Sequence, residues 1–140
     1  MFRPGHFGMI PDNLDSAFFE YNTKVIYFFK GSMVYKYDYK LSGSHSCCIE
    51  KPRQITSVFP PMNGRNDLHA PSGETYADGV DSVYLSWSAP YQLHLIKGEE
   101  AWRVDGYSIF GQYNEANLRV RYVGKWNTIW HYLCEADCPT

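Results

Sequence analysis

The chain has 140 residues, of which 44% are hydrophobic, 20% charged and 17% aromatic, and its formal net charge is -2. This length fits one domain or part of one, and the hydrophobic fraction can form a packed core. Because Lys and Arg are not in excess, nucleic acid is not an expected partner. The apolar runs fall short of the roughly 20 residues of a transmembrane helix. Residues 1–6 also lack the apolar stretch of a signal peptide.

An internal repeat is the most informative pattern in the sequence. Its two units open at Asp15 and Asp81, which lie 66 residues apart. Each unit contains an opening segment, then an apolar run that ends in Lys-Gly, then a segment that mixes aromatic, basic and apolar residues before an Asp. These segments are residues 14–19, 25–31 and 34–38 in the first unit and residues 80–85, 93–98 and 101–105 in the second. Such a repeat indicates an architecture built from copies of one structural unit.

Each unit is predicted to form three or four antiparallel strands, as in a blade of a β-propeller. The apolar run 25–29 is typical of a strand buried on both faces, and Gly31 and Gly98 are expected in turns. In the next strand, tyrosines alternate with charged residues, which predicts one packed face and one solvated face. The residues are Tyr35, Tyr37 and Tyr39 on the packed face and Lys36, Asp38 and Lys40 on the solvated face. Trp102 is expected to pack within the second unit.

The connecting segments are expected to be short helices and loops. Residues 52–60 lie between prolines and can hold a short helix, whereas residues 63–79 are rich in Gly, Asn, Asp and Ser and predict a loop. Aromatic residues spaced about four apart in residues 120–134 suggest a short amphipathic helix. Glu99 and Glu100 follow a turn and are expected to be solvated.

The four cysteines lie in two pairs, Cys47 with Cys48 and Cys134 with Cys138. Histidines lie nearby, but the spacing does not match the common zinc patterns. Disulfide bonds are therefore favoured, which implies an oxidising compartment. A bond between the adjacent Cys47 and Cys48 would be strained, so each is expected to bond elsewhere. Buried free thiols are the alternative.

Four features together resemble the hemopexin-like repeat family. They are the Asp-x-Ala opening at Asp15, the aromatic run 27–31, the strand 35–38 and the connector 52–60. The segment 125–134 is also similar to the closing segment of that family. The second unit departs from the pattern, because Val83 replaces the usual Ala and Leu95-Ile96 replaces the aromatic pair.

The resemblance implies an all-β fold of antiparallel propeller blades joined by short connector helices, with about two of the four blades present. Residues 1–140 are then one partial hemopexin-like domain. It comprises a blade at about 12–60, a long connector at about 61–79, a blade at about 80–120 and a closing segment at 121–140. The chain is expected to be either the C-terminal half of a longer secreted protein or a half-propeller that pairs with itself.

Within the family, the sequence is most like the C-terminal domain of a secreted matrix metalloproteinase. This implies a secreted, non-catalytic module that binds an extracellular protein or a matrix component. The sequence lacks the HExxH pattern of zinc proteases, so any catalysis is expected in another domain of the parent protein. A hemopexin-type carrier of heme or another small ligand is the alternative, and a structural propeller like a seed albumin is a third. Heme is not favoured, because no two histidines pair by spacing.

The family also implies sites at the central channel of the propeller. The backbone carbonyls of Asp15 and Asp81 are expected to coordinate a calcium or sodium ion, and the backbone amides of Ala17 and Val83 to face an anion. With half of the ring present, ion binding would be weak. The Asp side chains have an alternative role, which is to bond neighbouring backbone groups.

Three further expectations concern contacts outside the channel. A disulfide that involves Cys134 or Cys138 is implied by the way the family closes its propeller. Arg65, Asp67 and His69, in the predicted loop, are the candidate contacts for a partner. Two blades alone would expose sheet faces, so the isolated chain is expected to self-associate or to need a missing N-terminal half.

Overall fold

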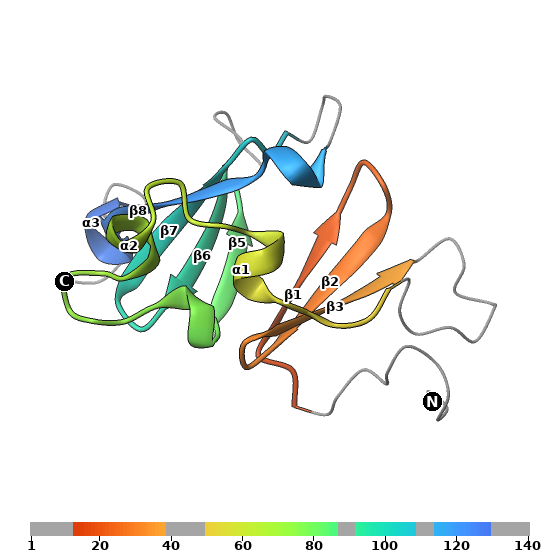
Figure 1. The fold of residues 1–140 in the computed structure, drawn as a ribbon, viewed down its shortest axis with the longest axis horizontal. Coiled ribbons are helices and arrows are strands. Elements are labelled where there is room, and N and C mark those ends of the chain that lie inside the picture. Colours follow the sequence, from red (N-terminus) through yellow and green to blue (C-terminus); the bar gives the residue numbers. More distant parts are fainter. Residues whose placement is uncertain (1–12, 39–49, 87–91, 109–113, 130–140) are drawn as a thin grey trace, which may run out of the picture.

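The computed structural model describes residues 13–38, 50–86, 92–108 and 114–129. These residues form two antiparallel sheets, each of four strands in sequential order (Figure 1). The first sheet, blade 1, contains β1 (Ser16–Glu20), β2 (Val25–Lys30), β3 (Met33–Asp38) and β4 (Arg53–Gln54). The second sheet, blade 2, contains β5 (Ser82–Leu85), β6 (Leu93–Lys97), β7 (Glu100–Asp105) and β8 (Arg119–Lys125). The expected all-β fold of blade-like antiparallel sheets is confirmed.

Short helices connect the strands. The helix predicted between the prolines is α1 (Ile55–Val58), which lies between the two blades in Figure 1. The connector continues through α2 (Arg65–Leu68) and the 3-10 helix η2 (Tyr76–Asp78), while η3 (Glu115–Asn117) and α3 (Trp126–Ile129) flank β8. No helix in the described ranges is long and apolar enough to cross a membrane.

Two connecting segments differ from their predictions. Residues 63–79 contain α2 and η2 instead of a plain loop, and the Thr75 side chain caps η2 by accepting a hydrogen bond of 3.1 Å from Ala77 N–H. The segment predicted as an amphipathic helix begins with β8, which pairs with β7, and among its described residues the helical part is limited to α3. Pairing with the edge of β7 satisfies the backbone groups of β8, and this outweighs the helical spacing of the aromatic residues.

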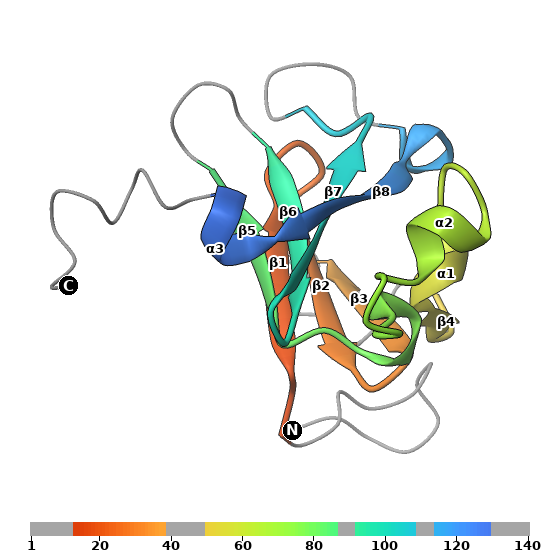
Figure 2. The ribbon, with the colours of Figure 1, turned by 90° about the vertical axis from the view of Figure 1, so that its left-hand side faces the viewer.

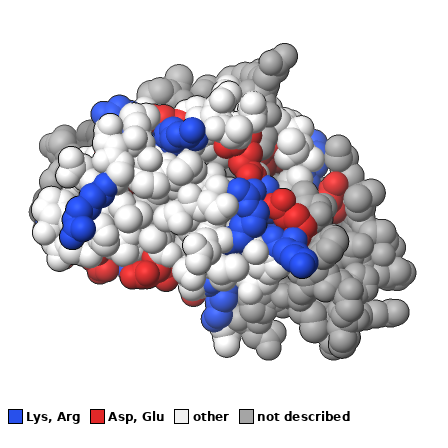
Figure 3. All heavy atoms as spheres, viewed as in Figure 1, with Lys and Arg blue, Asp and Glu red and all other residues white. Residues whose placement is uncertain are grey.

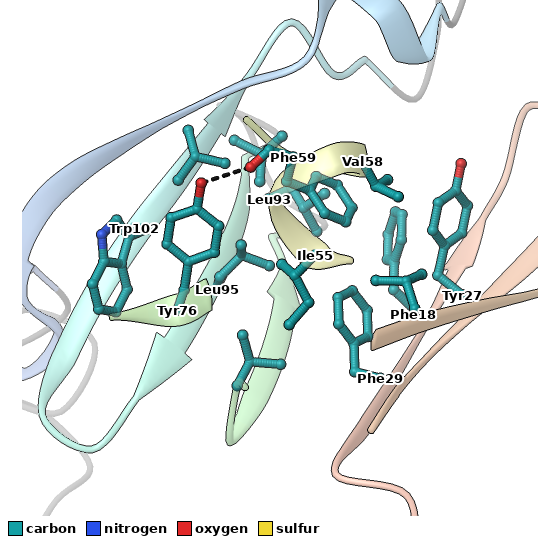
Figure 4. Packing of buried hydrophobic residues seen from close by; sticks show 14 of the residues in the cluster. Phe18, Tyr27, Phe29, Ile55, Val58, Phe59, Tyr76, Leu93, Leu95 and Trp102 are labelled. Atoms are coloured by element: carbon teal, nitrogen blue, oxygen red, sulfur yellow. Dashed lines mark hydrogen bonds between the residues drawn. The ribbon is translucent and has the colours of Figure 1, made fainter. Parts of the chain in front are cut away.

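One hydrophobic core runs from blade 1 through the connector to blade 2 (Figure 4). Phe29 of β2 stacks on Phe59 with 6.0 Å between the ring centroids. The Tyr76 hydroxyl donates a buried hydrogen bond of 2.6 Å to the Phe59 carbonyl. Trp102 is fully buried and contacts the rings of Tyr76 and Tyr122, which confirms its predicted packing role. The connector therefore supplies part of the core that joins the blades.

The blades use opposite faces of the repeat where they meet. When the two units are aligned, Phe18 corresponds to Tyr84 and Phe19 to Leu85. Phe18 is 7% exposed and belongs to the core, whereas Tyr84 is 40% exposed. At the next position the pattern reverses, because Phe19 is 39% exposed and Leu85 packs against the core. The blades are therefore packed head to tail. The face of blade 1 that carries Phe18 packs toward the face of blade 2 that carries Leu85, and these are opposite faces of the repeat.

Side chains along β3 alternate between two faces, as predicted, but the face that carries the charged residues is not the solvated one. Tyr35 and Tyr37 are half-buried, and Lys36, on the face predicted to be solvated, is only 8% exposed. The prediction of a solvated face is therefore wrong. Lys36 lies on the side of blade 1 that faces blade 2, where carboxylates neutralise its charge. Residues 39 and 40 lie outside the described residues.

Candidate functional site

The inner strands β1 and β5 lie beside each other, as Figure 2 shows. Val83 N–H donates a hydrogen bond of 3.1 Å to Ser16 Oγ across this boundary. One of the two amides predicted to face an anion is therefore engaged with blade 1. The other belongs to Ala17, an exposed residue of β1. The anion site at these two amides stays a prediction.

The side chains of Asp15 and Asp81 close equivalent turns in the two blades. Gly31 N–H donates to Asp15 Oδ2 at 2.7 Å, and Gly98 N–H donates to Asp81 Oδ2 at 2.6 Å. The φ angles of Gly31 and Gly98 are 54° and 60°, a left-handed conformation that favours glycine. Both Asp side chains thus take the alternative role of bonding neighbouring backbone. An ion at this position would have to use the backbone carbonyls.

The donor chemistry of those carbonyls suits an ion, but one chain supplies few of them. Calcium prefers oxygen ligands and commonly takes about six to eight. Asp15 and Asp81 contribute one carbonyl each. In the described part of the chain, no group of three or more His, Cys, Asp or Glu side chains could hold a metal. A channel ion would therefore need ligands from outside the two blades.

The three predicted partner contacts differ in their exposure. Arg65 of α2 is exposed and His69 is half-buried. Asp67 is 8% exposed, and its carboxylate accepts hydrogen bonds from Asn63 N–H at 2.9 Å and from Tyr122 N–H at 3.1 Å. Because both carboxylate oxygens bind backbone amides within the fold, Asp67 anchors α2 to β8. Its assignment as a partner contact is corrected, and Arg65 is the exposed residue of the three.

A charge network that the sequence analysis missed joins the two blades. Glu115, in η3, pairs with Lys36 of β3 and, at 2.5 Å, with Arg53 of β4. Glu50 lies 3.0 Å from Lys36 and 3.4 Å from Arg53. Figure 3 shows acidic and basic side chains gathered together on this face of the molecule. Although burial opposes its ionisation, the hydrogen bonds from Lys36 and Arg53 hold the pKa of Glu115 below its usual value.

Two more carboxylates are buried and bonded within the fold. Glu100 is 3% exposed, so the prediction that it is solvated is wrong; it accepts a hydrogen bond of 2.5 Å from the Tyr122 hydroxyl. This bond lowers the pKa of Glu100, while burial and the same bond raise the pKa of Tyr122 to about 12. Glu20 is fully buried and accepts hydrogen bonds from Thr23 and, in blade 2, from Tyr107. These carboxylates hold turns and blades in place.

The predictions for cysteines and histidines are tested only in part. All four cysteines, Cys47, Cys48, Cys134 and Cys138, lie outside the described residues, and the disulfide stays a prediction. His94 of β6 is 3% exposed, which agrees with a packing role. Burial, together with the positive charge of Arg103, lowers the pKa of His94 to about 4. Its imidazole is therefore neutral near pH 7.

The sequence resembles proteins of one metalloproteinase group. No family model matches the chain. The chain is 33% identical over 95 residues to matrix metalloproteinase-21 of Homo sapiens, a match that covers 68% of the chain and 15% of that protein. It is 32% identical over 91 residues to matrix metallopeptidase-21 of Danio rerio, covering 65% of the chain and 13% of that protein. Each match spans less than a sixth of the relative's length.

Solved structures share the fold. The hemopexin fold protein CP4 from cow pea matches with a TM-score of 0.62 and 25% identity, covering 92% of this chain and 49% of that chain. A plant albumin from Cicer arietinum matches with a TM-score of 0.57 and 21% identity, covering 90% and 47%. The two blades thus correspond to about half of each of these structures. Since the repeat, the fold and the sequence agree, the chain has a hemopexin-like fold and is similar in sequence to the matrix metalloproteinases.

Proposed function

We propose that the chain is an extracellular, non-catalytic module that recognises a protein or a component of the matrix. Its similarity to matrix metalloproteinases supports a secreted parent protein, in which any catalysis belongs to another domain. The hemopexin-like fold supports a binding role for this part of the protein. The same similarities do not favour the alternative of a heme carrier.

The observation that carries the proposal is an exposed but firmly held surface on the connector. Arg65 is exposed on α2, and Met62, in the preceding turn, is 42% exposed; we call these two residues the connector surface. Asp67 anchors the same segment through its bonds to Asn63 and Tyr122. Arg and Met are enriched in protein interfaces. A segment that is already ordered also loses little conformational freedom on binding.

Binding of the purified chain to immobilised collagen, gelatin and heparin tests this proposal. We expect saturable binding to at least one of these probes. Arg65→Glu should weaken that binding by at least about tenfold, because it reverses a charge in the contact. Lys51→Glu is the matched control, since Lys51 is also an exposed cation but lies outside the connector surface. Binding that is absent for every probe, or that both variants weaken equally, would contradict the proposal.

We also propose a weak calcium or sodium site at the inner strands. The backbone carbonyls of Asp15 and Asp81 would supply oxygen ligands, since the side chains of both residues already accept hydrogen bonds from Gly31 and Gly98. The test compares the melting temperature of a four-bladed assembly with calcium and with a chelator. A higher melting temperature in calcium is the expected result. Equal melting temperatures in calcium and in chelator would contradict the proposed site.

A further inference from the structure

An exposed Asn-Gly pair lies in the turn that leads into α2. Asn63 and Gly64 are both exposed. Apart from its chain neighbours, no described atom lies within 4 Å of the position that a Cβ of Gly64 would take. The φ angle of Gly64 is 59°, in the left-handed region that favours glycine. The Gly64 nitrogen is therefore not shielded by a side chain, and it follows directly after the residue that carries the side-chain amide.

Hydrogen bonds hold the turn on both sides of this pair but not at the groups between them. Asn63 N–H donates to Asp67 Oδ2 at 2.9 Å, and the Gly64 carbonyl accepts a hydrogen bond of 2.9 Å from Leu68 N–H. Within the described part of the chain, neither the Gly64 N–H nor the Asn63 side-chain amide makes a hydrogen bond. These two groups therefore have no hydrogen bond to give up before they react with each other.

We propose that Asn63 is a site of spontaneous covalent modification, in which its side-chain amide is lost. The Gly64 nitrogen gives its proton to a base and attacks Cγ of Asn63, which closes a succinimide ring. The bond from Cγ to the side-chain nitrogen breaks, and that nitrogen takes up a proton and leaves as ammonia. Water then opens the ring at one of its two carbonyls, which gives either aspartate or isoaspartate. Because the reacting groups belong to adjacent residues, the reaction requires water alone as a co-reactant.

The same ring could form at the pair Asp78-Gly79, but the fold protects that pair. Asp78 is exposed, whereas Gly79 is buried. Gly79 N–H donates a hydrogen bond of 3.1 Å to the Tyr76 carbonyl, and a Cβ on Gly79 would lie 3.3 Å from the Gly31 carbonyl oxygen. Attack by the Gly79 nitrogen would break this hydrogen bond and disturb closely packed backbone. Similar dipeptides in the same chain are therefore expected to react at different rates.

Asn66 shows that exposure of an asparagine is not sufficient. It lies in α2 and is exposed, as Asn63 is. The backbone nitrogen that follows it belongs to Asp67, and this N–H donates a hydrogen bond of 3.1 Å to the Gly64 carbonyl. The Asp67 side chain is itself buried, so the backbone at this position is fixed. The structure thus distinguishes Asn63 from another exposed asparagine in the same segment.

The modification places a new carboxylate inside the connector surface. Asn63 lies between Met62 and Arg65, and Arg65 is the cation of that surface. Either product carries a negative charge, which offsets the charge of Arg65. The isoaspartate product also lengthens the backbone of the turn by one atom. This consequence rests on the function proposed above: the connector surface would lose its net positive charge as the protein ages.

Peptide mapping by mass spectrometry, after incubation of the folded chain in mildly alkaline buffer, tests the proposal. Asn63 should lose its amide at least about tenfold faster than Asn66, which corresponds to a barrier lower by about 1.4 kcal/mol. Both aspartate and isoaspartate should form at position 63, while Asp78 should remain unchanged. In urea, Asp78 should also form isoaspartate, because unfolding frees the Gly79 nitrogen.

Asn63→Gln is the matched control, since it keeps an exposed side-chain amide but moves its carbonyl carbon one methylene further from the Gly64 nitrogen. This variant should keep its amide at position 63 under the same conditions, with the circular dichroism spectrum of the wild type. Conversion of Asn63 in urea alone, or equal conversion of Asn63 and Asn66 in the folded chain, would overturn the proposal. Because the readout is chemical, a failure to bind collagen, gelatin and heparin would contradict the proposed function without changing this result.

Discussion

Tyr35 in blade 1 and Trp102 in blade 2 occupy equivalent positions of the repeat, but Trp102 is fully buried and Tyr35 is half-buried. The next position behaves in the opposite way, because Lys36 is 8% exposed while its equivalent, Arg103, is half-buried. The same strand pattern thus turns its aromatic side to the core in blade 2 and its basic side to the interior in blade 1. Burial is decided by where the other blade lies, and not by the alternation of the strand itself.

The charges of the two blades follow from this difference. Lys36 faces blade 2, and its charge is neutralised by Glu115, which lies 79 residues away in the sequence. Arg103 faces away from blade 1 and pairs with Asp105 in its own strand at 2.8 Å. One ion pair therefore holds two blades together, and the other is local to one sheet.

The largest expected effect separates the two aromatic positions. Trp102→Ala should lower the free energy of unfolding by about 3–5 kcal/mol, because it leaves a cavity in the core. Tyr35→Ala should cost only about 1 kcal/mol, since its side chain is half-buried. Urea unfolding followed by circular dichroism measures both. Equal losses in the free energy of unfolding would show that the two repeat positions are packed alike, which would contradict the structure.

A second difference between the blades depends on pH. His94 occupies the position of Tyr27 in blade 1, and its pKa falls from 6.5 to about 4 in the folded state. A lowered pKa means that the unfolded chain binds the proton first. Stability is therefore complete above pH 6.5 and is lost as the pH falls toward 4, by up to about 3 kcal/mol.

Urea unfolding of the wild type and of His94→Gln across this pH range checks the expectation. The variant should lose much less stability than the wild type between these pH values, because glutamine does not titrate. Parallel pH profiles for the two proteins would show that the imidazole is not held neutral by burial.

The inter-blade ion pair should matter more than the local one. Glu115→Gln should lower stability by about 2 kcal/mol, because it leaves Lys36 poorly compensated at a largely buried position. Asp105→Asn should cost at most about 1 kcal/mol, because this half-buried pair is still screened by solvent and lies within one strand. Because the pKa of Glu115 is lowered from 4.5, its contribution is complete above that pH and disappears as the pH falls below it. Thermal melts of both variants at neutral and acidic pH measure this contrast. Equal shifts in melting temperature for the two variants would contradict it.

The smallest expected effect tests where the blades are alike. Asp15→Ala and Asp81→Ala each remove one hydrogen bond to a turn glycine, at 2.7 Å and 2.6 Å. Each substitution should cost about 1 kcal/mol. Chemical denaturation of the two variants compares them directly. A cost that is large in one blade and absent in the other would mean that the two turns are not equivalent.

The repeat allowed the fold to be predicted, because its signals are local. Lys-Gly turns, an apolar run between them and an Asp at a fixed distance are all readable within one unit. The same locality explains the role of the Asp15 and Asp81 side chains, whose partners lie within their own blades. The first three strands of each blade and α1 could therefore be predicted from the sequence, whereas β4 and β8 lie in segments that were predicted to be helical.

The buried polar groups were not predictable, because their partners are distant or belong to other elements. Lys36 was expected in solvent, since nothing near it in the sequence indicates that Glu115 lies opposite. Glu100 follows a turn, and its burial depends on Tyr122 in the next strand. Asp67 lies in a polar segment, but hydrogen bonds from two backbone amides hold its carboxylate in a buried position. In each case a tertiary hydrogen bond outweighs the usual exposure of a charged residue.

Hydrogen exchange measured by mass spectrometry tests most directly whether the two blades form one unit. The slowest amides of β2 and β3 and those of β6 and β7 should exchange with the same opening free energy, because one core holds both sheets. Trp102→Ala should lower that free energy by the same amount in both blades. If blade 1 opens at a lower free energy while blade 2 stays protected, or if the substitution affects blade 2 alone, the head-to-tail core described here is contradicted.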